Sequence, residues 1–296
     1  MSDPRLRLGE FDLAALEAEV RHAIDHHEPE RLDIVGQGEF SLALRWGDDG
    51  ERVVKRIPPF RNRTAADGYT ALVREYLDVL TRRGVRCVAT EAFTLERDDG
   101  SAVVYLSQPC LDSDRLVDHV LAAAEPQDSH PVIDELVDLI ASVPHAQVGL
   151  DGQVSNWYWF DDELWHLDFS TPILLTPEHG VRFDAAGFWR EYPAILRPLV
   201  QRELLKIAPQ FLDPAFVMKD AAANLVRQDL DGWMPAMIAA AADRTDVGFT
   251  EAEARAAYDA DAKIYPFLQR LKRWQRTWIQ RTGRRFDTLL PVEANY

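Results

Sequence analysis

Cysteine, basic charge and long apolar runs are all scarce in this sequence. The two cysteines, Cys87 and Cys110, have no metal-binding spacing, so we expect reduced thiols. No apolar run of about eighteen residues occurs and no apolar region follows Met1, so we expect no membrane span, no export and a cytoplasmic location. The formal net charge of -16 disfavours nucleic acid or an anionic membrane as the main partner, because both are bound through clustered Lys and Arg.

The remaining composition is that of an ordinary folded protein. Hydrophobic residues make up 47% and charged residues 28% of the 296 positions, close to globular averages. A chain of this length can form two modest lobes around a shared cleft. The acidic balance favours a neutral or cationic substrate through electrostatic steering.

The first third of the sequence has the pattern of a helix followed by a sheet. Apolar residues recur at helical spacing over residues 11–25, and a second helix is predicted from about residue 69 to residue 83, before Gly84. Alternating apolar segments separated by turn residues predict five strands, at residues 32–35, 42–46, 52–57, 85–95 and 101–106.

After residue 107 the pattern becomes mainly helical. The segment 107–111 interrupts it and is the predicted hinge between an N-terminal part, residues 1–107, and a C-terminal part, residues 108–296. A hairpin is expected near residues 157–167, and helices are predicted at 114–124, 131–143, 183–205, 215–227, 234–243 and 251–281. The sequence therefore predicts an α+β fold.

Two glycines, Gly36 and Gly38, lie between the first two predicted strands. Such a loop can lay backbone N–H groups over phosphates, although an ordinary hairpin turn has the same pattern. In the next strand, period-two alternation places Val53, Lys55 and Ile57 on one face. A lysine between two apolar side chains needs a partner. The alternative is an edge strand that points Lys55 to water.

Glu75 is the first candidate partner for Lys55. It lies on or beside the apolar stripe of the helix predicted over residues 69–83, so its carboxylate is expected to point inward. Glu91, in the following strand, is the second candidate. The alternative for Glu75 is a solvated position at the edge of the stripe, beside Arg74.

The segment from Gly149 to Pro172 carries the most specific pattern. Asp151 is followed by Asn156, then by an aromatic hairpin, and then by Asp168 and Phe169. A tight hairpin is a short route for bringing the Asn and the second Asp together, and such oxygen ligands suit Mg²⁺. The alternative is a turn Asp, a capping Asn and a strand-end Asp that have no common function.

The motifs follow one another in a definite order: glycine loop, strand lysine, helix glutamate, hinge, Asp-x4-Asn, hairpin and Asp-Phe. This order resembles that of the protein-kinase-like superfamily. The resemblance covers about residues 30–172. Helices are expected soon after residue 172, with no long activation segment, which is most similar to the aminoglycoside phosphotransferase branch. The resemblance implies a bilobal fold with a five-stranded antiparallel sheet in the N-terminal lobe and a mostly helical C-terminal lobe.

The resemblance also implies transfer of the ATP γ-phosphoryl group to a hydroxyl with Mg²⁺ as cofactor. Asp151 would orient the acceptor hydroxyl and take its proton, and Asn156 and Asp168 would hold the metal. Lys55, positioned by Glu75, would hold the phosphates. The resemblance also implies a nucleotide pocket. In this pocket the Leu106 carbonyl and the Gln108 N–H would contact the adenine edge, and Tyr105 would lie at the back. The implied pocket residues are Gly36, Gly38, Ser41, Val53, Lys55, Tyr105, Leu106 and Gln108.

Three departures from the family pattern bear on activity. Gly149 and Leu150 precede Asp151 where a His-Arg or His-Gly pair is usual, Ser41 replaces the third glycine of the loop, and Ser170 replaces the glycine after Asp-Phe. Three functions therefore stay open: a small-molecule phosphotransferase, a kinase of Ser or Thr in a peptide or biosynthetic precursor, and a catalytically silent binding module.

The segment of residues 266–285 differs in charge from the rest of the chain. It holds seven Lys or Arg and no acidic residue. Its aromatic residues share one helical face, which favours a docked terminal helix with a basic outer surface. The alternative is an interaction helix for an acidic partner or a membrane.

Overall fold

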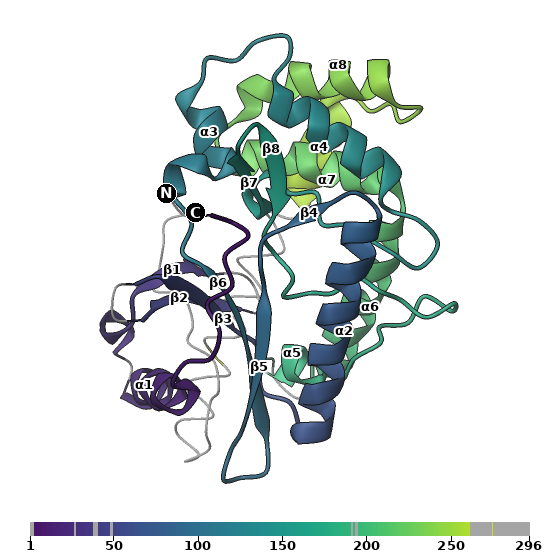
Figure 1. Cartoon of the computed structure of the whole chain (residues 1–296). Coiled ribbons are helices and arrows are strands. Elements are labelled where there is room, and N and C mark those ends of the chain that lie inside the picture. Colours follow the sequence, from purple (N-terminus) through teal and green to yellow (C-terminus); the bar gives the residue numbers. More distant parts are fainter. Residues whose placement is uncertain are drawn as a thin grey trace.

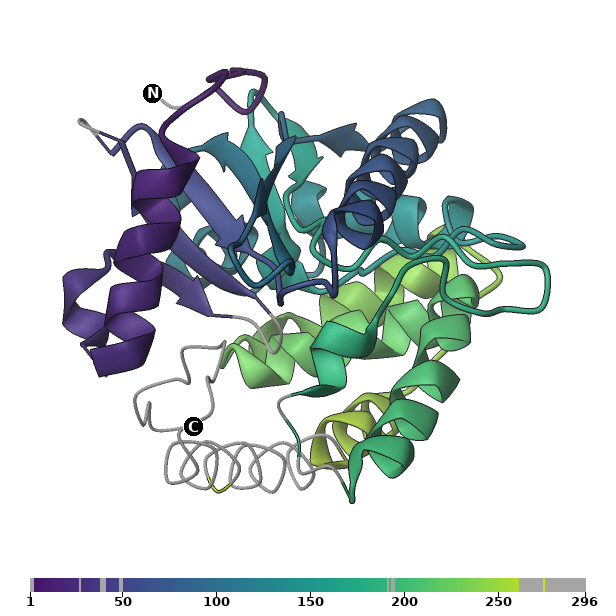
Figure 2. The same ribbon diagram turned by 90° about the horizontal axis from the view of Figure 1, so that it is seen from below.

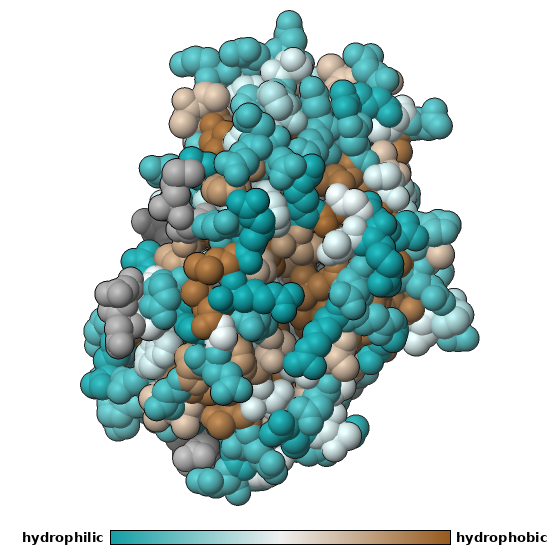
Figure 3. All heavy atoms as spheres, viewed as in Figure 1, coloured by the Kyte–Doolittle hydropathy of each residue, from teal (hydrophilic) through white to brown (hydrophobic). Residues whose placement is uncertain are grey.

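A computed structural model describes residues 3–26, 28–37, 41–47, 50–190, 192, 195–260 and 274. A five-stranded sheet with α1 (Leu13–His26) forms the lower end of the molecule in Figure 1, and helices form the upper end, around a short hairpin. The predicted α+β class is confirmed. The face seen in Figure 3 is mostly hydrophilic, with hydrophobic residues gathered near its centre.

The five-stranded sheet is antiparallel throughout, as expected. Its strands follow the order β1-β2-β3-β6-β5 and span Ile34–Gln37, Leu42–Trp46, Arg52–Arg56, Ala102–Pro109 and Glu91–Glu96, respectively. The prediction of one strand over residues 85–95 is wrong. Its first part forms β4 (Arg86–Cys87), which pairs in parallel with β8 (Glu163–His166) in a second sheet that also contains β7 (Trp157–Phe160).

Helices α1 and α2 (Arg63–Arg82) lie on opposite sides of the five-stranded sheet (Figure 2). Asn62 caps α2 by accepting a hydrogen bond from the Ala65 N–H at 2.9 Å, so the helix begins six residues earlier than the expected residue 69. Gly84 follows the helix at a φ of +88°, a conformation that glycine adopts without strain.

A buried ion pair joins α1 to the sheet. Arg56 donates to the Glu17 carboxylate from Nε at 2.9 Å and from Nη2 at 3.0 Å, and Tyr105 donates its hydroxyl to the same carboxylate at 2.6 Å. Burial raises the pKa of Glu17, but the charge and hydrogen bonds of Arg56 and the Tyr105 hydroxyl outweigh it, so the pKa lies below its usual value. The carboxylate is therefore ionised and fully bonded.

The second part of the chain is mostly helical, as predicted. The predicted helix over residues 183–205 is divided in two, α5 (Ala186–Arg190) and α6 (Arg197–Ile207), and residues 251–260 are also helical. Most of the basic segment 266–285 lies outside the described residues. Short 3-10 turns occur at 29–31, 113–115, 154–156, 208–212 and 231–233, and the helices α3 to α8 span Val117–Ala123, Pro131–Ser142, Ala186–Arg190, Arg197–Ile207, Pro214–Arg227 and Met234–Arg244.

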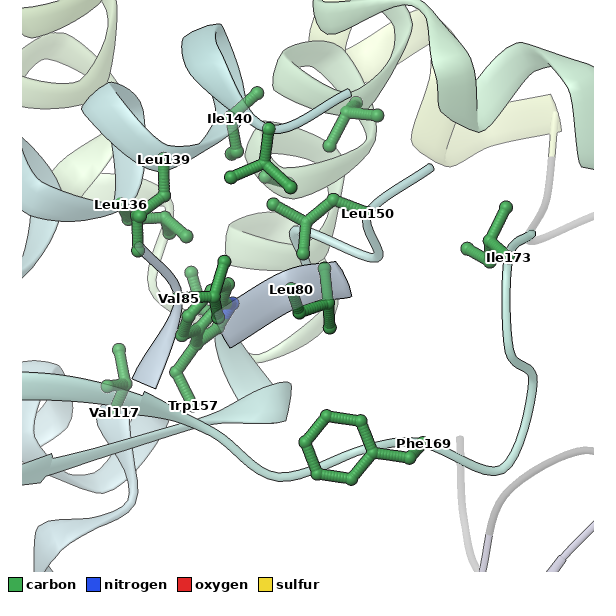
Figure 4. Packing of buried hydrophobic residues seen from close by; sticks show 14 of the residues in the cluster. Leu80, Val85, Val117, Leu136, Leu139, Ile140, Leu150, Trp157, Phe169 and Ile173 are labelled. Carbon is green, nitrogen blue, oxygen red and sulfur yellow. The ribbon is translucent and has the colours of Figure 1, made fainter. Parts of the chain in front are cut away.

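One hydrophobic cluster connects the sheet to the helices. It contains Leu80 of α2, Ile140 of α4 and Trp157 of β7, together with Leu150 and Phe169 from the loops on either side of the hairpin (Figure 4). The core thus continues across residue 107, and the boundary placed there stays a prediction. Within the described part of the chain, the helices are too short or too polar to cross a bilayer.

Candidate active site

Lys55 is buried on the sheet face that the strand alternation predicts. It is only 9% exposed, and its Nζ lies 3.2 Å from Oδ1 of Asp168. The same ammonium group donates to the carbonyl of Leu167 at 3.4 Å. The expected partner for a buried lysine is therefore present, and it is the acid of the Asp-Phe pair.

The prediction that Glu75 pairs with Lys55 is wrong. Glu75 is exposed on α2 and makes two hydrogen bonds with Arg182, at 2.8 and 2.7 Å, which lower its pKa. The helix turns its neighbours Leu72 and Tyr76 inward, and residue 75 falls just outside that stripe. Glu91 does not pair with Lys55 either, because its carboxylate accepts the backbone N–H groups of residues 8 and 9.

Two tyrosines on the inward face of α2 contact the loops of the site instead. Tyr76 donates its hydroxyl to the carbonyl of Gly149 at 2.9 Å, and Tyr69 donates to the carbonyl of Ser170 at 2.8 Å. Both side chains are buried. α2 therefore holds the segment before Asp151 and the segment after Asp168. The only sequence signal for these contacts is that both tyrosines belong to the apolar stripe of the helix.

Glycines flank Asp151 because the backbone passes close to its neighbours. A Cβ at Gly149 would overlap Cγ2 of Ile173, and a Cβ at Gly152 would lie 2.8 Å from the side chains of Ile140 and Val217. Real Cβ atoms do not approach neighbours so closely. The tight packing explains why position 149 carries no larger side chain.

Asp151 has the electrostatic environment of a proton acceptor. Its side chain accepts the Gln153 N–H at 3.1 Å, and the side chain of Asn156 lies close enough to lower its pKa. Burial, and then the negative charges of Asp220 and Asp168, raise its pKa from 3.8 to about 7. A carboxylate with a pKa near neutrality is suited to general base catalysis.

Asn156 and Asp168 are brought together by the hairpin between them. Leu167 donates its N–H to the carbonyl of Asn156 at 3.0 Å, directly before Asp168. Burial raises the pKa of Asp168, but the Lys55 ammonium group and hydrogen bonds from Ser170 outweigh burial and bring the pKa below its usual value. The Asp168 side chain is 28% exposed, so an ionised carboxylate faces the solvent.

The side chains of Asn156 and Asp168 fit a magnesium ion whose remaining ligands would come from a nucleotide and water. A carboxylate and an amide supply hard oxygen atoms, and Mg²⁺ is commonly held by one or two such groups together with phosphates and water. The described residues contain no group of three or more His, Cys, Asp or Glu placed to hold a metal on their own. Asn156 and Asp168 would therefore need phosphate oxygens to complete the coordination.

His166, which the sequence reasoning missed, also belongs to the site. It is fully buried in β8, and its Nε2 lies 3.2 Å from the backbone carbonyl of Asp151. Burial lowers its pKa to about 4, so the imidazole is neutral at physiological pH. The available signal was a histidine at the end of the strand that leads into Asp168.

The structure contradicts the expected position of Tyr105. Its ring belongs to the cluster under α1, and its hydroxyl binds Glu17, on the sheet face opposite Lys55. Since side chains alternate along β6, the residue that shares the face of Lys55 is Leu106. Tyr105 therefore cannot line a nucleotide cleft at Lys55.

The backbone groups expected at the adenine edge are directed toward β3. Cys110 donates its N–H to the carbonyl of Glu51 at 2.8 Å, and backbone groups on every second residue of an antiparallel strand face the same neighbour. The N–H and C=O groups of Leu106 and Gln108 therefore point toward β3, and the prediction that they contact adenine is wrong. The Gln108 side chain instead bonds the carbonyl of Leu167 at 2.8 Å.

The glycine loop is only partly described. Gly36 pairs with Ala43, and a Cβ at Gly36 would make ordinary contact at 3.6 Å, so this position does not require glycine. Gly38 lies outside the described residues. Ser41 and Val53 are both partly exposed, Val53 on the face of Lys55. Their role in nucleotide binding stays a prediction.

Helix α7 borders the site with two polar side chains one turn apart. Gln153 donates its side-chain N–H to Oδ2 of Asp220 at 3.1 Å, and Ser155 donates its backbone N–H to Oδ1 of the buried Asn224 at 3.3 Å. The loop between Asp151 and the hairpin is thus fixed from the helical side as well. Sequence reasoning identified the helix and missed both residues.

Comparison with known proteins gives a family match and a number of remote structural likenesses, including the two that follow. A family described as "Family of unknown function (DUF6206)" matches residues 15–276. No curated protein matches the chain. A structure of the GDP and kanamycin complex of APH(2")-IIia has 10% identity to this chain and a TM-score of 0.35, and the match covers 77% of this chain and 97% of that chain.

The second structure is WaaP in complex with acyl carrier protein. It has 12% identity and a TM-score of 0.38, and it covers 91% of this chain and 99% of that chain. At these TM-scores we draw no functional inference from either likeness.

Proposed function

The chain belongs to DUF6206, a family of unknown function, and we propose that it is an ATP- and Mg²⁺-dependent phosphotransferase that acts on a hydroxyl group of a small molecule. One observation carries the proposal. The chain gathers Lys55, Asp168, Asn156 and a carboxylate at Asp151 with a pKa near 7 around one partly exposed site. Each has a distinct role in phosphoryl transfer.

Asp151 acts on the acceptor in this mechanism. The acceptor oxygen forms a bond to the γ-phosphorus, the bond between that phosphorus and the β,γ-bridging oxygen breaks, and ADP leaves. The hydroxyl proton passes to the Asp151 carboxylate. A pKa of about 7 lets this group take up the proton at neutral pH and release it to water afterwards.

Lys55 and Asp168 hold the phosphates and the metal. Mg²⁺ bound to Asp168 and Asn156 would neutralise charge on the transferred phosphoryl group. Lys55 now pairs with Asp168 at 3.2 Å, and its ammonium group would then move to the phosphate oxygens. Its burial keeps the positive charge away from bulk water, where it would be screened.

The acceptor is expected to be neutral or cationic. Asp220 lies close enough to raise the pKa of Asp151, so the acceptor side of the site carries negative charge, and the whole chain has a formal charge of -16. Both features favour a cation by electrostatic steering. We propose that the enzyme acts in the cytoplasm, where it has access to ATP.

Thermal stabilisation by MgATP tests the nucleotide site. A ligand at one hundred times its Kd stabilises a protein by about 2.7 kcal/mol, which gives a clear rise in Tm. We expect this rise for the parent and for Lys206→Ala, an exposed lysine on α6, and its loss in Lys55→Ala and Asp168→Asn. If MgATP and MgGTP leave the parent Tm unchanged, the proposal fails.

One observation favours a second candidate, a catalytically silent nucleotide-binding module. Glu75, the residue expected to position Lys55, is exposed and bound to Arg182. Lys55 therefore lacks the helix carboxylate that orients it in the pattern the sequence resembles. A silent module predicts the same MgATP stabilisation with no release of phosphate, whereas a phosphotransferase predicts both.

A further inference from the structure

The loop that carries Asp151 lacks the side chain expected to orient it. Gly149 and Leu150 precede the acid, and neither side chain can donate a hydrogen bond. The leucine is fully buried in the apolar core. A polar contact that fixes the loop has to come from elsewhere in the chain.

Tyr76 supplies one such contact at the Gly149 carbonyl, and His166, in β8, supplies the one at Asp151 itself. Its Nε2 lies 3.2 Å from the backbone carbonyl oxygen of Asp151, fifteen residues away in the sequence. Because a carbonyl can only accept a hydrogen bond, Nε2 carries the hydrogen and donates it. Nδ1 is buried and has no hydrogen-bond partner among the described residues. A hydrogen there would be unsatisfied, which favours the Nε2–H tautomer.

The imidazole ring is held firmly enough to direct this bond. Trp157, the residue opposite His166 in the hairpin, packs edge-on against it with ring centroids 4.7 Å apart and an interplanar angle of 79°. Phe169 packs against it at 5.0 Å. Both aromatic residues are fully buried. The ring thus has little freedom to rotate away from the Asp151 carbonyl.

We propose that His166 is a positioning residue, which fixes the backbone at Asp151 relative to Asp168 and so aligns the acceptor-activating carboxylate with the metal-binding acid. The inference depends on the proposed phosphotransferase function. One side chain contacts the Asp151 backbone and the ring of the residue that follows Asp168. A shift of about 1 Å between groups that must act together can lower a rate by about a hundredfold.

Two amide substitutions separate this role from that of a simple core residue. In His166→Gln the side-chain NH2 group can occupy the position of Nε2 and donate to the Asp151 carbonyl. In His166→Asn the amide reaches only the position of Nδ1, so the carbonyl loses its donor. Both variants bury an amide in the same apolar surroundings, which makes each the control for the other.

The assay is the slow release of phosphate from MgATP with water as acceptor, together with the Kd for MgATP. We expect His166→Gln to keep kcat within about threefold of the parent and His166→Asn to lose at least about tenfold, a barrier increase of about 1.4 kcal/mol. The Kd for MgATP is expected to stay the same in both. Equal kcat values for the two variants, or a loss confined to Kd, would overturn the role of His166.

A measurement of the tautomer is independent of activity. Nitrogen-15 NMR of the histidine side chains in the parent is expected to show the neutral Nε2–H form for His166, with the assignment made from His166→Gln. An Nδ1–H form would overturn the inference. If the parent neither binds MgATP nor releases phosphate, the proposed function fails and the positioning role fails with it. If the parent is active and the amide variants are equal, only the role of His166 fails.

Discussion

Replacing Asp151 with Asn is expected to stabilise the fold while it removes the reactive group. The structure raises the pKa of this acid from 3.8 to about 7, so the folded state holds a proton that the unfolded state has already released. Below the unfolded pKa, the raised pKa of Asp151 has no effect on stability. The free energy of unfolding then decreases as the pH rises from about 4 to about 7. Above the folded pKa, the acid is ionised in both states and the cost is constant.

The magnitude follows from the size of the shift. One pKa unit corresponds to 1.36 kcal/mol, so a shift of about three units destabilises the protein by at most about 4 kcal/mol above pH 7. At pH 5 the same linkage gives about 2 kcal/mol. Asn at position 151 carries no charge and keeps an oxygen for the Gln153 N–H. The stabilisation by Asp151→Asn is therefore expected to increase by about 2 kcal/mol between pH 5 and pH 8.

Urea denaturation of the parent and Asp151→Asn at pH 5 and pH 8 measures this difference directly. Asp78→Asn, which changes an exposed acid on α2, is the matched control and should change stability by less than about 0.5 kcal/mol at both pH values. A stabilisation that is absent at pH 8, or that is larger at pH 5, would refute the reasoning. It would mean that the folded protein does not resist ionisation of Asp151.

Three further substitutions test the parts of the structure that support the site. Glu17→Gln replaces the ionised acceptor of two hydrogen bonds from the buried Arg56 with a neutral amide, so the free energy of unfolding should fall by about 3 kcal/mol in urea denaturation, and a fall below about 1 kcal/mol would contradict a buried pair. Gly152→Ala places a Cβ 2.8 Å from two buried side chains and should destabilise by about 1 to 3 kcal/mol by the same measurement; an unchanged midpoint would show that the loop can relax. Glu75→Gln breaks an exposed ion pair and should cost less than about 1 kcal/mol and leave the MgATP Kd unchanged, whereas a tenfold weaker Kd would show that Glu75 serves the site.

The features of the fold that depend on local pattern were predictable. Strand β2 has the predicted bounds, and the alternation along β3 correctly placed Lys55 between apolar neighbours on the inner face. The period of two is a property of the extended backbone itself. In the same way, the hairpin between Asn156 and Asp168 follows from turn residues and alternation. The break predicted at residues 107–111 is misplaced, because β6 continues to Pro109 and stays paired with β3.

The predictions that failed concern features that depend on contacts between distant segments. Residues 85–95 read as one strand because nothing local shows that Arg86 pairs with Trp165 in another sheet. Glu75 lies at the edge of an apolar stripe, where a rotation of the helix by a few tens of degrees decides between the interior and the solvent. The contacts of Tyr76 and His166 with backbone carbonyls require the folded loop.

The most direct test of phosphoryl transfer is the release of phosphate from MgATP by the parent and by Asp151→Asn, measured with nucleotide above its Kd. The proposed mechanism predicts slow release by the parent and a loss of at least about a hundredfold in the variant, because general base catalysis contributes that much or more. MgATP should still raise the Tm of the variant. Release by the variant at the parental rate would contradict a catalytic role for Asp151, and binding without any release by the parent would identify the chain as a silent module.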